Sequence, residues 1–182
     1  MEPENPLTGA LTLFDARNGK EFLEEFRMES DRAAAILAGA YLDQSLLQIL
    51  RRSVVPKLGL EDKLLGTDKP LGTFSARINV CAAFGLIGEE EFRDLHWVRR
   101  IRNAFAHGQH GLTFDSPELA KFAGQSAILR RFSRPLQETT RSQLNTVTAV
   151  LMLLLSDREA QATPVQLAQH QWSVTASPPS KD

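Results

Sequence analysis

A polar, basic ridge follows one face of a helix that the sequence predicts in the middle of the chain. Its members recur at i, i+4, i+7 and i+11, with one further arginine at the edge: His96, Arg99, Arg100, Asn103 and His107. Histidine can transfer a proton and arginine can stabilise charge on phosphoryl oxygens, so this basic ridge has the residue types that bind an anion or a phosphodiester. A solvated or interface face gives the same pattern and is the more frequent case.

Arg102 lies within the basic ridge in sequence but projects onto a different face. At about 100° per residue it falls on the apolar stripe that includes Ile101 and Phe105, so we expect it to be substantially buried. In a continuous helix Arg102 and His107 then point about 140° apart. Joint chemistry by these two side chains requires a helix break near Ala106 or a contribution from a second subunit.

Other charged residues also fall on apolar helix faces. Arg77 projects onto the apolar face of its own helix, and acids of the preceding central helix share a stripe with apolar residues. A guanidinium out of water needs a carboxylate or several carbonyls, because an uncompensated buried charge is costly. We therefore expect these acids to pair with Arg77 or Arg102 and to fix the helix register; snorkelling of the arginine stems is the alternative. The predicted structural charge network comprises Glu29, Asp31, Arg32, Asp43, Arg77 and Arg102.

Helical periods divided by glycine and proline predict the scaffold that positions these side chains. The sequence has no alternating strand pattern of useful length and no internal repeat, so the expected fold class is all-α, a single compact multi-helix domain. Its central helix is apolar nearly all round, which marks it as buried. The expected helices cover residues 30–52, 73–84 and 89–107, with Thr73 as a cap, a short helix after Ser116-Pro117 and a longer one over 141–155.

Both ends of the chain have compositions that bury too little surface to offset the entropy of ordering. Residues 1–9 are polar and contain proline, and residues 159–182 are rich in Gln, Ser, Thr and Pro. We expect a disordered N-terminus over residues 1–9, one helical domain over residues 10–158 and a disordered C-terminal tail over residues 159–182.

The composition argues against several classes of function. The chain has 182 residues and a formal net charge of -1, which disfavours binding of nucleic acid through bulk charge. The single cysteine, Cys81, excludes an internal disulfide framework and a cysteine metal cluster, and it fits a reducing cytoplasm. The longest apolar run, Val147 to Leu155, is shorter than the about 20 residues that span a bilayer. We expect a cytoplasmic protein with no cofactor, no metal and no membrane partner.

Separated blocks of the sequence agree in order with one bacterial family. The blocks are Glu29-Ser30-Asp31-Arg32, Tyr41-Leu42-Asp43, Pro70-Leu71-Gly72-Thr73-Phe74-Ser75-Ala76-Arg77-Ile78, Gly85-Leu86-Ile87 and Ile101-Arg102-Asn103-Ala104-Phe105-Ala106-His107. Over residues 11–155 the chain resembles the mannitol operon repressor family of small bacterial proteins. The resemblance implies an all-helical, non-enzymatic regulator of a sugar-alcohol operon. It also implies action through a regulatory protein partner rather than a helix-turn-helix.

A narrower resemblance rests on Arg102-Asn103 and His107, which are similar to the R-x4-6-H motif of HEPN domains. These domains are all-helical, and many are metal-independent ribonucleases that act as dimers. The resemblance implies that Arg102 stabilises phosphoryl charge, that His107 transfers a proton and that Asn103 orients them. The site would form between two subunits.

Two functions therefore compete. The lead hypothesis is a non-enzymatic regulator that forms a homodimer and binds a partner protein. The alternative is a HEPN-type ribonuclease that cleaves RNA with Arg102, Asn103 and His107 as catalytic residues. Direct reading of DNA is the least favoured, because the near-neutral charge and the lack of a recognisable reading helix leave little for major-groove recognition.

Overall fold

Helix α3, Asp31–Ser53, is the central element of the domain. The computed structural model of the protein describes residues 26, 28–55, 58–108, 111–131 and 139–167. Ser30 caps α3 by accepting a hydrogen bond from the Ala33 amide at 3.2 Å, and the helix ends at Ser53. Both ends agree with the predicted central helix to within a residue.

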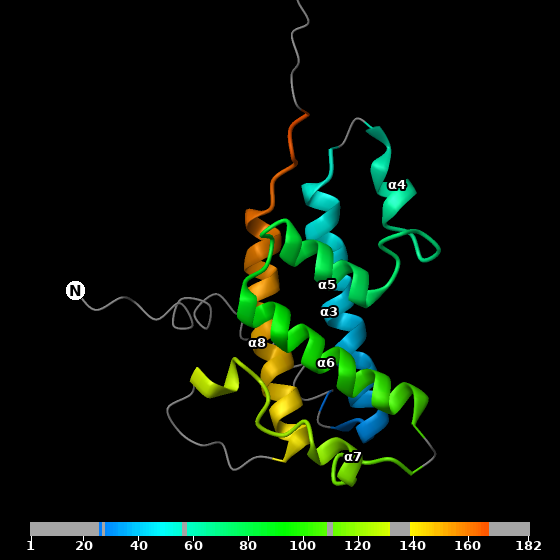
Figure 1. Ribbon diagram of the computed structural model, residues 1–182, viewed down its shortest axis with the longest axis vertical. Helices are drawn as coiled ribbons and strands as arrows, with labels where there is room; N and C mark the ends of the chain where they lie inside the picture. The colour runs from blue at the N-terminus through cyan, green and yellow to red at the C-terminus, as the bar shows by residue number, and fades with distance from the viewer. Residues whose placement is uncertain (1–25, 27, 56–57, 109–110, 132–138, 168–182) are drawn as a thin grey trace, which may run out of the picture.

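Three further long helices pack around α3 (Figure 1): α5 spans Phe74–Ala83, α6 spans Glu89–His107 and α8 spans Thr140–Gln161. Helices α3 and α8 lie side by side, and α6 crosses them diagonally with α5 next to it. Thr73 caps α5 by accepting a hydrogen bond from the Ala76 amide at 3.2 Å, as its position in the sequence predicts. The predicted helix over residues 89–107 is confirmed at both ends.

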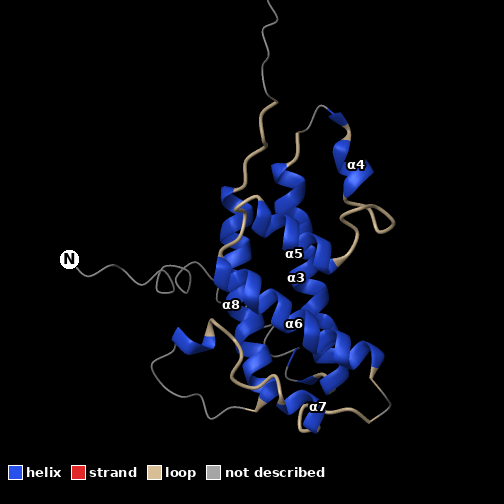
Figure 2. Ribbon diagram, in the orientation of Figure 1, coloured by secondary structure: helices blue, strands red, loops and turns tan. Residues whose placement is uncertain are grey.

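Short helical segments fill the connections between the long helices. Helix α4 spans Leu60–Leu64, α7 spans Pro117–Ala120 and a 3-10 turn spans Leu129–Arg131. The all-α fold class is confirmed, because the part of the chain that the structure describes contains helices, turns and loops and no strand (Figure 2). Helix α4 was not predicted, since five residues are too few to show a helical period.

Helix α8 continues to Gln161, beyond Leu155, where its apolar run and the predicted helix end. The added turns are polar, and their side chains reach neighbouring helices. Arg158 Nε lies 3.2 Å from Glu91 Oε1, and Glu159 Oε1 lies 3.1 Å from Arg52 Nη2. The predicted N-terminal segment, residues 1–9, and residues 168–182 of the predicted tail lie outside the described residues.

One apolar core lies between the long helices. Its largest fully buried side chains come from all four of them and include Leu42, Leu46, Ile78, Leu95, Trp97, Phe105, Leu144 and Leu151. By length and composition α3 could cross a membrane, but half of its most apolar stretch is buried inside the domain. Because α5, α6 and α8 pack against it, α3 has the surroundings of the core helix of a globular domain.

Candidate functional site

The position of α6 is fixed by two buried polar contacts to the chain that follows it. The Asp94 carboxylate is fully buried and accepts hydrogen bonds from Ser126 Oγ and from the Ala127 and Ile128 amides, each at 2.8 Å. Trp97 Nε1 donates to a backbone carbonyl of the same connection at 2.9 Å. Sequence reasoning missed Asp94, because its partners lie far away in the chain and nothing local relates them to it.

A groove of about 580 Å³ opens between α3, the start of α5 and α6. We call it the arginine groove, because α6 contributes Arg99, Arg102 and Asn103 to its wall. Helix α3 supplies small and apolar residues and one acid, and α5 supplies its first turn. The lining residues from these two helices and from the two residues before α5 are Ile36, Gly39, Ala40, Asp43, Gly72, Thr73, Phe74 and Ser75.

Arg102 reaches the arginine groove by lying across α3 at Gly39. A Cβ atom on Gly39 would lie 2.8 Å from Arg102 Cγ, so only glycine gives the arginine stem its present path. Arg102 is half-buried, and its Nη1 donates to Asn103 Oδ1 at 3.1 Å. The helix projection puts Asn103 on the opposite face from Arg102, whereas in the structure the long Arg102 side chain reaches Asn103 and both line the groove.

Arg77, rather than Arg102, pairs with the acid of the central helix. Arg77 is 6% exposed, and its Nη1 lies 2.8 Å from Asp43 Oδ1. Its Nε donates to the Leu71 carbonyl at 2.9 Å and its Nη2 to the Leu65 carbonyl at 3.3 Å. Burial raises the pKa of Asp43, and the hydrogen bond and charge of Arg77 and the charge of Arg102 oppose this rise. Asp43 and Arg77 tie α3 to α5 and to the loop before it.

The rest of the predicted charge network has different partners. Asp31 forms an ion pair with Arg141 of α8 and accepts the Phe114 amide at 3.0 Å. Glu29 contributes its backbone carbonyl, which also accepts from Arg141, and Arg32 Nη2 donates to a backbone carbonyl just after α6 at 3.2 Å. Sequence reasoning missed Arg141, because nothing local relates it to an acid far away in the chain.

The residues of the basic ridge lie in three different environments. His96 is half-buried and contacts two polar side chains. Its Nε2 lies 3.0 Å from Asn79 Oδ1, and its Nδ1 accepts a hydrogen bond from Arg99 Nε at 3.2 Å. Burial, followed by the charges of Arg99 and Arg100, lowers the pKa of His96, which agrees with an unprotonated Nδ1 that accepts. Asn103 turns into the arginine groove, as described above. His96 is therefore a neutral link between α5 and α6.

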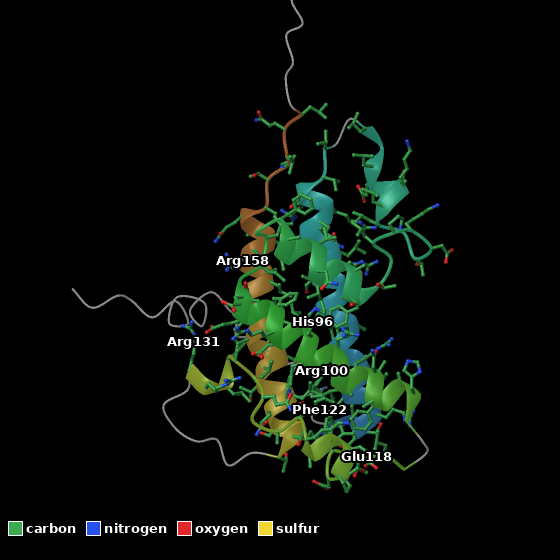
Figure 3. The ribbon with its side chains drawn as sticks, viewed as in Figure 1. His96, Arg100, Glu118, Phe122, Arg131 and Arg158 are labelled. Carbon is green, nitrogen blue, oxygen red and sulfur yellow. The ribbon has the colours of Figure 1, made fainter. Side chains whose placement is uncertain are left out.

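The remaining ridge residues face outward. Arg100 is exposed, lies 5.7 Å from the centre of the Phe122 ring and donates to Gln125 Oε1 at 3.3 Å (Figure 3). His107 is exposed at the last residue of α6. Helix α6 runs unbroken from Glu89 to His107, so the helix break that would bring His107 to Arg102 within one chain is absent.

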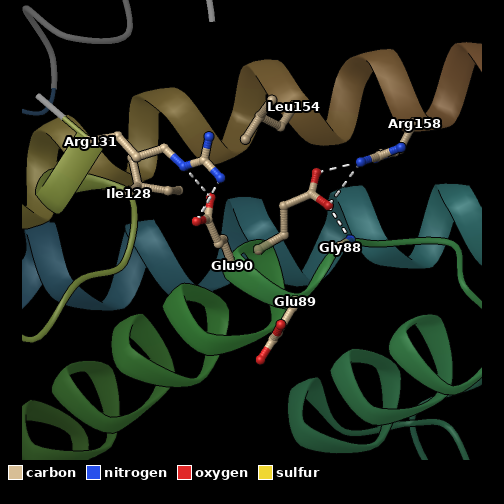
Figure 4. A pocket seen from close by; sticks show the side chains of 8 residues that line it. Gly88, Glu89, Glu90, Ile128, Arg131, Leu154 and Arg158 are labelled. Carbon is tan, nitrogen blue, oxygen red and sulfur yellow. Dashed lines mark hydrogen bonds and ion pairs between the residues drawn. The ribbon is translucent and has the colours of Figure 1, made fainter. Parts of the chain in front are cut away.

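A second cavity, of about 390 Å³, lies where α6 begins beside α8 (Figure 4). Two of its three glutamates are paired with its two arginines. Glu90 Oε2 lies 2.6 Å from Arg131 Nε, and the buried Glu91 carboxylate accepts from Arg158 Nε and Nη2, each at 3.2 Å. Glu91 also accepts from the amide of Gly88 before α6. This cavity is a structural junction between the two helices.

The described residues offer little for metal or thiol chemistry. No group of three or more His, Cys, Asp or Glu side chains among them could hold a metal ion. Cys81 is buried, and burial raises the pKa of its thiol to about 12 against the opposing charge of Arg77. A thiol with so high a pKa is a core residue rather than a nucleophile.

Comparison with known proteins identifies the fold of this all-helical domain. No family model matches the sequence, and no curated protein matches it. A chain in the X-ray structure of the MtlR-HPr complex from Escherichia coli superposes with a TM-score of 0.57 and 18% sequence identity, over 78% of this chain and 98% of that chain. The protein therefore has an MtlR-like fold, and at this identity the similarity concerns the fold alone.

Proposed function

We propose that the protein is a non-enzymatic bacterial regulator of a sugar-alcohol operon that acts by binding a partner protein. The observation that carries this proposal is the fold similarity to a chain of the MtlR-HPr complex, which spans nearly the whole of that chain. The sequence blocks that resemble the mannitol operon repressor family lie in α3, α5 and α6 or in the segments next to them. The proposed partner is an HPr-type protein.

The exposed part of the basic ridge is the proposed contact surface for that partner. Arg100 and His107 lie on the outside of α6, whereas His96 is held between helices and Asn103 faces the arginine groove. Exposed arginine and histidine side chains suit a polar protein interface. We also propose a cytoplasmic homodimer of one helical domain over residues 10–158, which represses its operon without reading bases directly.

The geometry of α6 gives the ribonuclease alternative no specific support. Arg102 is bound to Asn103 inside a groove that does not include His107, and His107 lies at the exposed end of the same continuous helix. Within one chain these residues do not form a joint site. Only a second copy of the chain could supply the missing half, as in a dimeric HEPN domain.

Deleting the gene is expected to raise transcription of the sugar-alcohol operon several-fold in cells grown without the sugar alcohol. The reason is that a repressor lowers expression only while it is present. Quantitative PCR of the operon transcripts measures the effect, and the wild-type gene supplied on a plasmid should restore repression. Unchanged transcripts in the deletion strain would refute the proposed function.

A further inference from the structure

The arginine groove carries two guanidinium groups that form no ion pair with any residue the structure describes. Arg99 donates to the neutral Nδ1 of His96, and Arg102 donates to the amide oxygen of Asn103. Among the residues that the structure describes, no carboxylate lies within 4.0 Å of either guanidinium. The acid on the groove wall, Asp43, is already paired with Arg77. The groove therefore holds a net charge of about two positive units.

Half-buried guanidinium groups favour a bound anion. Each makes one hydrogen bond to the part of the chain that the structure describes and keeps several further N–H donors, and partial burial removes some of the water that would satisfy them. The planar donor fork of arginine matches the oxygens of phosphate, and such charge-assisted pairs are about twice as strong as neutral ones. A phosphate monoester carries about -1.5 to -2 charges near neutral pH. This charge matches that of two arginines better than the single charge of a carboxylate ligand does.

The remaining groove wall suits a small molecule that carries such a phosphate. The volume of about 580 Å³ falls within the roughly 300–1,000 Å³ of typical small-ligand sites. Thr73, Ser75 and Asn103 supply polar atoms, and Ile36 and Phe74 supply apolar surface. The arginines provide charge, and the rest of the wall provides a mixed polar and apolar surface for a short organic body.

We propose that the arginine groove binds the phosphate group of a small phosphorylated molecule, with Arg99 and Arg102 contacting the phosphate oxygens and Asn103 holding Arg102 in place. This site goes beyond partner binding, because it faces the space between α3, α5 and α6 rather than the outer surface that carries Arg100 and His107. It gives the domain a place where a metabolite can bind independently of the partner protein.

The position of Arg102 in this site depends on its close approach to Gly39 of α3. Because a Cβ atom at residue 39 would lie 2.8 Å from Arg102 Cγ and 3.3 Å from Arg102 Cβ, a larger residue there pushes the arginine out of its path. Gly39→Ala therefore changes the position of Arg102 without removing any charge. A site that needs Arg102 in its present place should respond to this change, whereas nonspecific attraction of anions should not.

Binding is tested by titrating the full chain with inorganic phosphate and with glycerol 3-phosphate, followed by two-dimensional NMR, with sodium chloride at equal ionic strength as the control. We expect saturable shifts in amides around the groove for both phosphates and none for glycerol. Arg99→Gln, Arg102→Gln and Gly39→Ala should each raise the Kd at least about tenfold, the effect of losing about 1.4 kcal/mol. Arg100→Gln, outside the groove, should leave the Kd unchanged.

Three outcomes would overturn the site. The first is a response to phosphate no larger than the response to chloride. The second is an equal loss in Arg100→Gln and Arg102→Gln, which would indicate nonspecific attraction. The third is succinate binding as tightly as glycerol 3-phosphate, which would refute the phosphate assignment. The spectra of each variant show directly whether it is folded, and Arg99→Gln tests the groove without disturbing the contact with Gly39.

Discussion

Replacing Asp94 with alanine is expected to lower the free energy of unfolding by about 3–5 kcal/mol. The Asp94 carboxylate is fully buried and accepts three hydrogen bonds at 2.8 Å, from one hydroxyl and two backbone amides. Alanine leaves all three donors buried without an acceptor, and each unsatisfied group costs about 1–3 kcal/mol. Urea denaturation followed by circular dichroism measures the loss.

Two further variants make this prediction specific. Asp94→Asn keeps one acceptor oxygen but turns an NH2 group toward a donor. The free energy of unfolding should therefore fall by an intermediate amount. Asp115→Ala removes an exposed aspartate and should change stability by less than about 0.5 kcal/mol. If Asp94→Ala were no more destabilising than Asp115→Ala, then Asp94 would not anchor α6 to the following connection.

Replacing Arg77 with alanine is expected to lower the free energy of unfolding by about 3 kcal/mol at neutral pH. The change leaves Asp43 without its ion-pair partner and the carbonyls of Leu65 and Leu71 without a donor. Arg93→Ala is the matched control, because its ion pair with Glu89 is exposed and such pairs contribute about 0–1 kcal/mol. Urea denaturation of both variants measures the difference.

The loss of unfolding free energy caused by Arg77→Ala should become smaller as the pH is lowered. Burial already raises the pKa of Asp43, and removing Arg77 removes a hydrogen bond and a charge that lower it, so the pKa rises further. An acid whose pKa is higher in the folded state contributes stability that is present below the unfolded pKa and is lost as the pH rises through the folded pKa. Denaturation at mildly acidic and at neutral pH tests this. If the loss of unfolding free energy did not change with pH, Asp43 would not be left as an unpaired buried carboxylate in this variant.

The sequence predicted the helices well because local signals set their ends. Ser30 and Thr73 cap α3 and α5 through their own side chains, and the capping geometry involves only the next few residues. The buried central helix followed from its apolar composition, and burial of Arg77 followed from helix periodicity. These features depend on residues close together in the chain.

The contacts between distant residues could not be predicted in the same way. The ion pair of Asp31 with Arg141 depends on how α8 packs beside α3, and the position of Arg102 depends on the glycine that α3 places opposite it. The hydrogen bond from Arg102 to Asn103 depends on the conformations of the two side chains, and a helix projection does not include these. The arginine groove follows from these tertiary contacts, and a helix projection without them places its residues on two faces.

The proposed function is tested most directly by calorimetric titration of the purified full chain with HPr from the same organism. We predict saturable binding with a Kd on the order of micromolar, weakened at least about tenfold by Arg100→Glu at the exposed surface. Arg99→Gln, inside the arginine groove, should bind HPr as the wild type does. No detectable binding at about a hundred times that concentration would contradict the proposal that this protein acts through such a partner.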